Sequence, residues 1–137
     1  MKKHTATVLL AMLAAQVSVP ATATELVVIV HPKNRATRMF GEQASQFFLG
    51  KSSLFTPVEY GDSNALRAEF AQKVLGKDTA QVKAIWSKLV FTGKAVPPRE
   101  YATAADVKRA VAADVSAIGY IDRNSVDDSV KVILSIP

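Results

Sequence analysis

The sequence contains no cysteine and only two histidines. Without cysteine, no disulfide can form, and the 137-residue chain must owe its stability to an ordinary hydrophobic core. Thiolates and clustered imidazoles, the usual ligands of structural zinc, are missing as well. His31 stands alone beyond the first few residues, and a lone histidine is far more often structural than metal-binding. The sequence therefore predicts no metal site, and nothing in it indicates a cofactor.

The common motifs of catalysis are also missing. The chain has no G-x-S-x-G elbow, no paired-histidine zinc motif and no P-loop. Ser63 and His31 each follow an apolar run that reads as a strand, so they could meet in space, but their spacing does not require it. The carboxylate pair Asp127-Asp128 lies in a polar loop, where a solvated turn is the simpler interpretation. We therefore expect that the protein is not an enzyme.

No apolar run at the N-terminus is long enough to span a bilayer, which takes about 20 residues. The chain begins MKKHTATVLLAMLAAQVSVPATA, in which Lys2 and Lys3 precede a short apolar stretch and Ala21-Thr22-Ala23 has the small-x-small pattern of a cleavage site. This pattern predicts a cleaved secretory signal peptide over residues 1–23, with an N-terminal membrane anchor as the alternative. The paired lysines favour a periplasmic location, and the mature protein would be one domain, residues 24–137.

A dense cluster of basic residues is likewise missing. Without Lys2 and Lys3, 15 basic and 12 acidic residues remain, a net charge of +3, and the basic ones are spread along the chain. Electrostatic binding to nucleic acid would favour a basic stripe, so we expect no nucleic-acid partner. The modest positive excess is compatible with an anionic ligand without arguing for one.

Strand-like and helix-like segments alternate along the rest of the chain. Residues 26–30 are five apolar residues in a row, four of them β-branched, which is typical of a strand buried on both faces. The expected order is a strand, a helix, a strand, three helices and two strands. This order predicts an α/β fold, a three-layer single domain with a mixed β-sheet flanked by helices. The other expected strands are 56–60, 117–121 and 130–136, and the expected helices are 41–49, 64–75, 79–91 and one beginning at 103.

Two interpretations concern the core. Apolar residues recur at helical spacing in the third expected helix, which predicts that this stripe is buried. Trp86 and Tyr120 are most simply core aromatics. The stripe consists of Val82, Ile85, Trp86, Leu89 and Val90.

The stretch Gly61-Asp62-Ser63-Asn64 lies between an expected strand and an expected helix. The first N–H groups of a helix lack internal partners, so such a turn can hold an oxyanion. Ser63 and Asn64 could add side-chain donors, and Arg67, one turn on, a charge-assisted one. The same letters are also preferred N-cap residues, and Asp62 is itself an anion that could occupy the site. A plain helix cap and an anion cradle both stay open.

Three other arginines could serve an anion but are more often solvated loop residues. Arg99 follows Pro97-Pro98 and precedes an expected strand, so it could reach the same edge of the sheet. Arg35 and Arg38 lie on the loop after the first expected strand.

Several fragments follow one another along residues 26–136. They are Phe48-Leu49-Gly50-Lys51, the Asp62-Ser63-Asn64 turn, Val74-Leu75-Gly76, the segment from Trp86 to Phe91-Thr92-Gly93 with Pro97-Pro98, and Ala117-Ile118-Gly119-Tyr120. In this order the fragments resemble the phosphate ABC transporter substrate-binding proteins of the type 2 periplasmic binding protein superfamily. The resemblance implies one of the two α/β lobes that in full-length members close on an oxyanion. It also implies that Asp62, Ser63, Asn64 and Ala65 match an Asp-Ser-Gly-Thr-like ligand turn, in which Asn64 and Ala65 replace the glycine and the threonine.

The function expected from the residues and the resemblance together is an exported module that binds a small oxyanion weakly, phosphate being suspected. Its link to phosphate ABC transport would make a membrane permease a partner. The alternative is an envelope interaction module that has kept the lobe and lost the ligand, with a membrane protein or a second copy, in a homodimer, as its partner. The expected ligand-binding residues are Gly61, Asp62, Ser63, Asn64 and Arg67.

Overall fold

The structure is a computed structural model, which describes residues 25–137. The expected signal peptide, residues 1–23, lies outside the described residues. Strand β1 (Leu26–Val30) is an inner strand of the sheet, with a neighbour on each side, and all five of its residues are fully buried. Its unbroken apolar run fits this place, because a strand covered on both faces has no side chain that meets water.

A five-stranded mixed sheet forms the middle of the molecule, in the order β3-β2-β4-β1-β5. β2 (Thr56–Tyr60) runs parallel to β3 (Arg99–Tyr101) and to β4 (Ala117–Asp122). β1 runs antiparallel to β4 and to β5 (Lys131–Ile136). The sheet is therefore mixed, as the sequence predicts, and β2 and β3 make up one edge of it.

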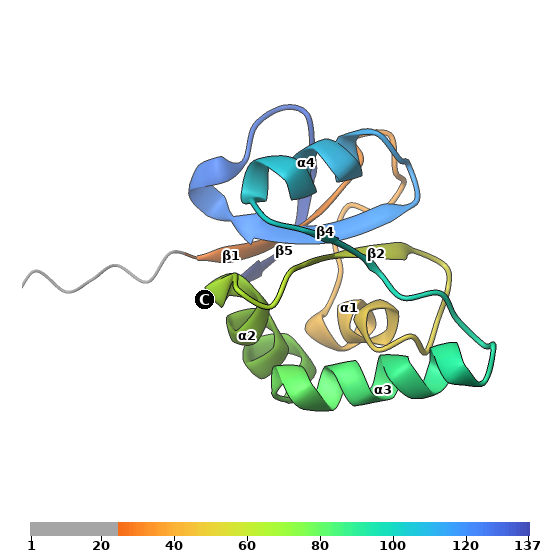
Figure 1. The fold of residues 1–137 in the computed structure, drawn as a ribbon. Helices are drawn as coiled ribbons and strands as arrows, with labels where there is room; N and C mark the ends of the chain where they lie inside the picture. Colours follow the sequence, from red (N-terminus) through yellow and green to blue (C-terminus); the bar gives the residue numbers. More distant parts are fainter. Residues whose placement is uncertain (1–24) are drawn as a thin grey trace, which may run out of the picture.

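Helices cover both faces of the sheet (Figure 1). α4 (Ala104–Ala112) lies alone on one face, where Gly119 of β4 lets it approach closely: a Cβ at this glycine would lie 3.0 Å from Val107 and 3.1 Å from Val111. On the side of the other face lie α1 (Gly41–Phe48), α2 (Ala65–Phe70), which continues as a π-helical turn (Ala71–Leu75), and, farther from the sheet, α3 (Thr79–Phe91). The predicted three-layer α/β fold is confirmed.

Stacked aromatic side chains join this second helix layer to the sheet. The Phe70 ring of α2 lies flat on the Tyr120 ring of β4, with centroids 3.9 Å apart. Phe48 of α1 meets both rings edge-on, 4.7 Å from Phe70 and 5.7 Å from Tyr120. Tyr120 is thus a core aromatic, as expected, and the cluster fixes where α2 begins relative to the end of β2.

The structure contains one strand, β3, that the expected order of strands and helices leaves out, although a strand is expected directly after Arg99. β3 is only three residues long and largely exposed, so no alternation of apolar and polar side chains marks it. Its pairing with β2 places Glu100 beside Glu59 and Tyr101 beside Tyr60. The segment from Pro97 to Tyr101 is thereby held along the edge of the sheet.

The prediction of a buried stripe on α3 is wrong for most of its residues. Val82 is buried, but Trp86 and its apolar neighbours are half-buried and Val90 is 41 % exposed. The reason is that α3 does not lie on the sheet: the indole N–H of Trp86 donates to the carbonyl of Phe48, 2.8 Å away, at the end of α1. α3 therefore contacts the end of α1 rather than the sheet, and part of its apolar face lines a cavity.

Gly50, just after α1, lies in close contact with α3. Its φ of +70° suits glycine, and a Cβ there would lie 2.5 Å from Leu89 Cδ1 and 3.2 Å from Trp86 Cη2. We expect Gly50→Ala to lower the free energy of unfolding by about 2–3 kcal/mol, from backbone strain and from the displaced helix. Urea unfolding measures the loss.

Gly76→Ala is the matched control for this substitution. Gly76 has a similar φ, +63°, but a Cβ there would meet nothing within 4 Å. We expect it to cost about 1 kcal/mol, the backbone strain alone. Equal losses for the two variants would show that α3 does not depend on its contact with Gly50.

No helix within residues 25–137 combines the length and the apolar character that a membrane crossing requires.

Candidate functional site

The Gly61–Asn64 turn follows β2 directly and begins α2. The N–H of Gly61 donates to the Tyr101 carbonyl at 3.0 Å, which ties the turn to β3. Asn64 is the N-cap: its Oδ1 accepts from the Leu66 N–H at 2.9 Å, and its Nδ2 donates to the Ala102 carbonyl at 3.1 Å. Both functional groups of the Asn64 side chain are thus engaged within the fold, which is the helix-cap role that the sequence left open.

Asp62 and Ser63 form the exposed tip of the turn. The Asp62 carboxylate pairs with Lys83 of α3 and lies 3.2 Å from Arg67 Nη1. The hydrogen bond from Lys83 is the main reason why the pKa of Asp62 lies below its usual value. Within residues 25–137, the backbone N–H groups of Asp62 and Ser63 donate to no other protein group. The tip therefore offers two free N–H donors and the Ser63 hydroxyl, next to a carboxylate.

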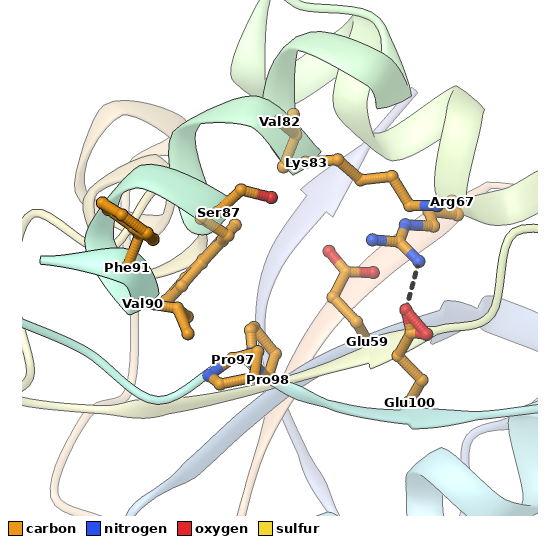
Figure 2. A pocket seen from close by; sticks show the side chains of 11 residues that line it. Glu59, Arg67, Val82, Lys83, Ser87, Val90, Phe91, Pro97, Pro98 and Glu100 are labelled. Atoms are coloured by element: carbon orange, nitrogen blue, oxygen red, sulfur yellow. Dashed lines mark hydrogen bonds and ion pairs between the residues drawn. The ribbon is translucent and has the colours of Figure 1, made fainter. Parts of the chain in front are cut away.

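Arg67 lies beneath the turn and is only 7 % exposed. Its Nη1 donates to the Tyr60 carbonyl and to Glu100 Oε1, each at 2.8 Å. Burial alone would lower the pKa of Arg67, but the hydrogen bond to Glu100 and the nearby carboxylates raise it, so the side chain stays charged. All its hydrogen bonds to described residues use this one nitrogen. Figure 2 shows the other terminal nitrogen turned toward the cavity.

Glu59, on β2, is a buried carboxyl group, 5 % exposed. Its Oε2 accepts from the Tyr120 hydroxyl at 2.5 Å and from the Tyr60 N–H at 3.1 Å. Burial raises its pKa to about 7, although these donors and Arg67 oppose the rise. Burial, with the neighbouring Glu59, also raises the pKa of Tyr120. Glu59 therefore takes up its proton at a much higher pH than an ordinary glutamate, and its carboxyl group faces the cavity (Figure 2).

A cavity of about 430 Å³ lies between α3 and the edge of the sheet formed by β2 and β3. One end is charged, with Glu59, Arg67, Lys83 and Glu100. The rest is mostly apolar, with Ser87 as its one hydroxyl. The apolar lining consists of Val82, Trp86, Val90, Phe91, Pro97 and Pro98. Because Arg67 and Lys83 both contact Asp62, the charged end of the cavity adjoins the Gly61–Asn64 turn.

The remaining basic candidates do not reach this cavity. Arg99 is exposed on β3 and is not among the lining residues. β1 is antiparallel to β4, and β4 is parallel to β2, so the loop after β1 lies at the opposite end of the sheet from the turn. Arg35 and Arg38 are exposed on that loop. His31 also follows β1, so it lies at the opposite end of the sheet from Ser63, and the two side chains do not meet.

The sequence predicts Arg67 as a site residue but not Glu59, Lys83, Glu100 or Trp86. Glu59 had a signal: it is a carboxyl group inside an otherwise apolar strand, and a buried charge needs a partner or a raised pKa. The sequence gives no such signal for Lys83 and Glu100, because their positions near Arg67 depend on how α3 and β3 pack against β2. Within residues 25–137, no three His, Cys, Asp or Glu side chains are grouped as a metal ion would require.

Comparison with solved structures finds the same fold in phosphate-transport proteins. A protein from Clostridium perfringens, assigned as a phosphate ABC transporter substrate-binding protein and solved with bound phosphate, superposes with a TM-score of 0.64 at 22 % identity over 79 % of this chain. An ABC-type phosphate transport receptor from Vibrio cholerae (TM-score 0.62, 20 % identity) and PstS from Borrelia burgdorferi (0.60, 13 %) match over the same share.

The chain has the fold of one lobe of these binding proteins. It spans 43 %, 44 % and 46 % of the three structures, less than half of each. At these identities the likeness shows the fold alone. No protein-family model and no curated protein matches the sequence. What the site can bind therefore depends on the residues of this chain.

Proposed function

We propose that this protein is a solute-binding module that holds a small oxyanion, with phosphate as the first candidate. Arg67 is the main ligand, and the Gly61–Asn64 turn forms the adjoining wall, with the Asp62 and Ser63 N–H groups and the Ser63 hydroxyl as further donors. The proposal includes export, which the sequence of residues 1–23 supports, and a membrane permease as partner.

The observation that carries the proposal is the state of Arg67. The residue is only 7 % exposed, and its guanidinium is held in place through Nη1 and turned toward an open cavity with its other terminal nitrogen. Side chains fixed in this way bind oxyanions through charge-assisted hydrogen bonds without losing much entropy. The fold is the one found in structures named for phosphate transport, one of them with phosphate bound, which supports phosphate as the first ion to test.

The charges around Arg67 predict that the binding is weak. Arg67 already forms ion pairs with two carboxylates, Asp62 and Glu100. Lys83 also pairs with Asp62, but not with Glu100. With Glu59 protonated, the two cations Arg67 and Lys83 and the two carboxylates Asp62 and Glu100 together carry no net charge. An anion must then compete with two carboxylates, and within residues 25–137 no second lobe shields it from water.

Thermal unfolding at low salt tests the proposal with phosphate, sulfate and chloride. Phosphate at about 100 times its dissociation constant stabilises the folded state by roughly 2.7 kcal/mol, and we expect the midpoint to rise by about 10 °C. A shift of the same size with all three salts would contradict the proposal.

Ser63→Ala and Ser53→Ala make a matched pair for locating the ion. Both serines are exposed, but Ser53 lies before β2, at the other end of the sheet. We expect Ser63→Ala to reduce the phosphate-induced shift and Ser53→Ala to leave it unchanged. Equal shifts in both variants would place the ion away from the turn.

A further inference from the structure

The cavity is larger and more apolar than a small inorganic ion requires. A water molecule takes up about 30 Å³ of liquid volume, so a volume of about 430 Å³ would hold many waters beside any ion at the charged end. Cavities of a few hundred Å³ that are mostly apolar, with a few fixed polar groups, are typical of sites for organic ligands. An inorganic oxyanion has no apolar surface, so the apolar lining of the cavity does not contribute to its binding.

We propose that the cavity binds an organic oxyanion, an acid group carried on an aryl or branched alkyl body, with the acid group at Arg67 and the body against the apolar wall of α3 and Pro97-Pro98. This inference rests on the proposed function and names the class of ligand for the same site.

The acid group finds two buried polar side chains at the charged end. Arg67 offers the edge of its guanidinium that is not used by Tyr60, Asp62 and Glu100. Glu59, 5 % exposed, uses Oε2 for Tyr120 and Tyr60, which leaves Oε1 for a ligand. In its protonated form Glu59 donates a hydrogen bond to an anion, as a carboxyl group held neutral by burial can.

Exposed apolar side chains of α3 line the cavity and can contact the body of the ligand. Phe91 is 94 % exposed and Val90 is 41 % exposed, although both line the cavity. An aryl group between these side chains and the prolines would remove apolar surface from water on both sides. Bare phosphate gains nothing from this wall, so the wall would select for the organic ester over the free ion.

Phenyl phosphate and inorganic phosphate are the two probes that test the inference. Trp86, the single tryptophan of the chain, lines the cavity and reports binding by its fluorescence. At about pH 6, where Glu59 is mostly protonated, we expect phenyl phosphate to bind at least about tenfold more tightly than inorganic phosphate. Phenol, which has the ring without the acid group, serves as the third probe, and we expect it to bind more weakly than phenyl phosphate.

Substitutions at the mouth of the cavity locate the aryl group. Because Val90 and Phe91 are exposed, the double variant Val90→Ala/Phe91→Ala should fold normally. It should lose most of the advantage of phenyl phosphate over inorganic phosphate. Val96→Ala is the matched control: Val96 is 84 % exposed but does not line the cavity, and its variant should keep the full advantage.

The outcomes separate the two proposals. Equal affinity for phenyl phosphate and inorganic phosphate would overturn this inference and leave the proposed function in place. Phenol that binds as tightly as phenyl phosphate, or an advantage that survives the Val90→Ala/Phe91→Ala change, would also overturn it. If neither phosphate binds, both proposals fail.

Discussion

The variant Glu59→Gln is expected to be more stable than the natural protein at pH 8, by up to about 3 kcal/mol. Burial raises the pKa of Glu59 from its ordinary 4.5 to about 7. Between these two pH values the folded state keeps a proton that the unfolded chain has lost, so the free energy of unfolding falls as the pH rises from about 4.5 to 7. A rise of this size corresponds to about 3 kcal/mol, which glutamine, uncharged at every pH, does not lose.

Thermal or urea unfolding at several pH values checks this expectation. At pH 8 the midpoint of Glu59→Gln should lie about 10 °C above that of the natural protein, and the two should converge at about pH 4. Glu42→Gln removes the same charge from an exposed site on α1 and should change the stability by less than about 0.5 kcal/mol. A Glu59→Gln variant that is less stable at pH 8 would contradict the raised pKa of Glu59: it would mean that the carboxylate, through Arg67, stabilises the folded state.

The variant Arg67→Met is expected to lose about 3 kcal/mol of stability at neutral pH. Methionine fills much of the volume, but it leaves the Tyr60 carbonyl without its donor and the Glu59, Asp62 and Glu100 carboxyl groups without the shared cation. Urea unfolding measures the loss. Part of it should return at low pH, where the acidic groups are protonated and no longer repel one another.

Arg109→Met is the matched control for this change. Arg109 pairs with Asp106 along α4, but its side chain is 79 % exposed, so its loss should cost less than about 0.5 kcal/mol. A loss of similar size in both variants would contradict the view that Arg67 is the buried centre of the charged group.

How much the sequence predicts can be judged from individual elements. The apolar run 26–30 predicts β1 correctly because a strand covered on both faces leaves a signal at every position. The helices expected at 79–91 and from 103 onward begin where predicted, next to the N-caps Asp78 and Thr103, since capping is a local hydrogen bond. Signals of this local kind predict the layers and the mixed sheet.

What the sequence does not predict depends on contacts between distant segments. β3 exists because Pro97 to Tyr101 lies along β2, which its own three exposed residues do not reveal. Three residues of the stripe on α3, Val82, Trp86 and Val90, line a cavity, and periodicity cannot distinguish this from burial in the core. Arg67 is predicted as a site residue, but its partners Glu100 and Lys83 come from two other elements.

A titration of the 15N-labelled protein with phosphate, followed by NMR, tests the central claim most directly. The claim predicts that the backbone amide signals of Asp62 and Ser63 and the side-chain Nε–H signal of Arg67 shift together, with one dissociation constant, while those of Arg35 and Arg38 do not. Shifts that are confined to the far end of the sheet, or no shifts at millimolar phosphate, would show that the turn is a helix cap and that no oxyanion binds at Arg67.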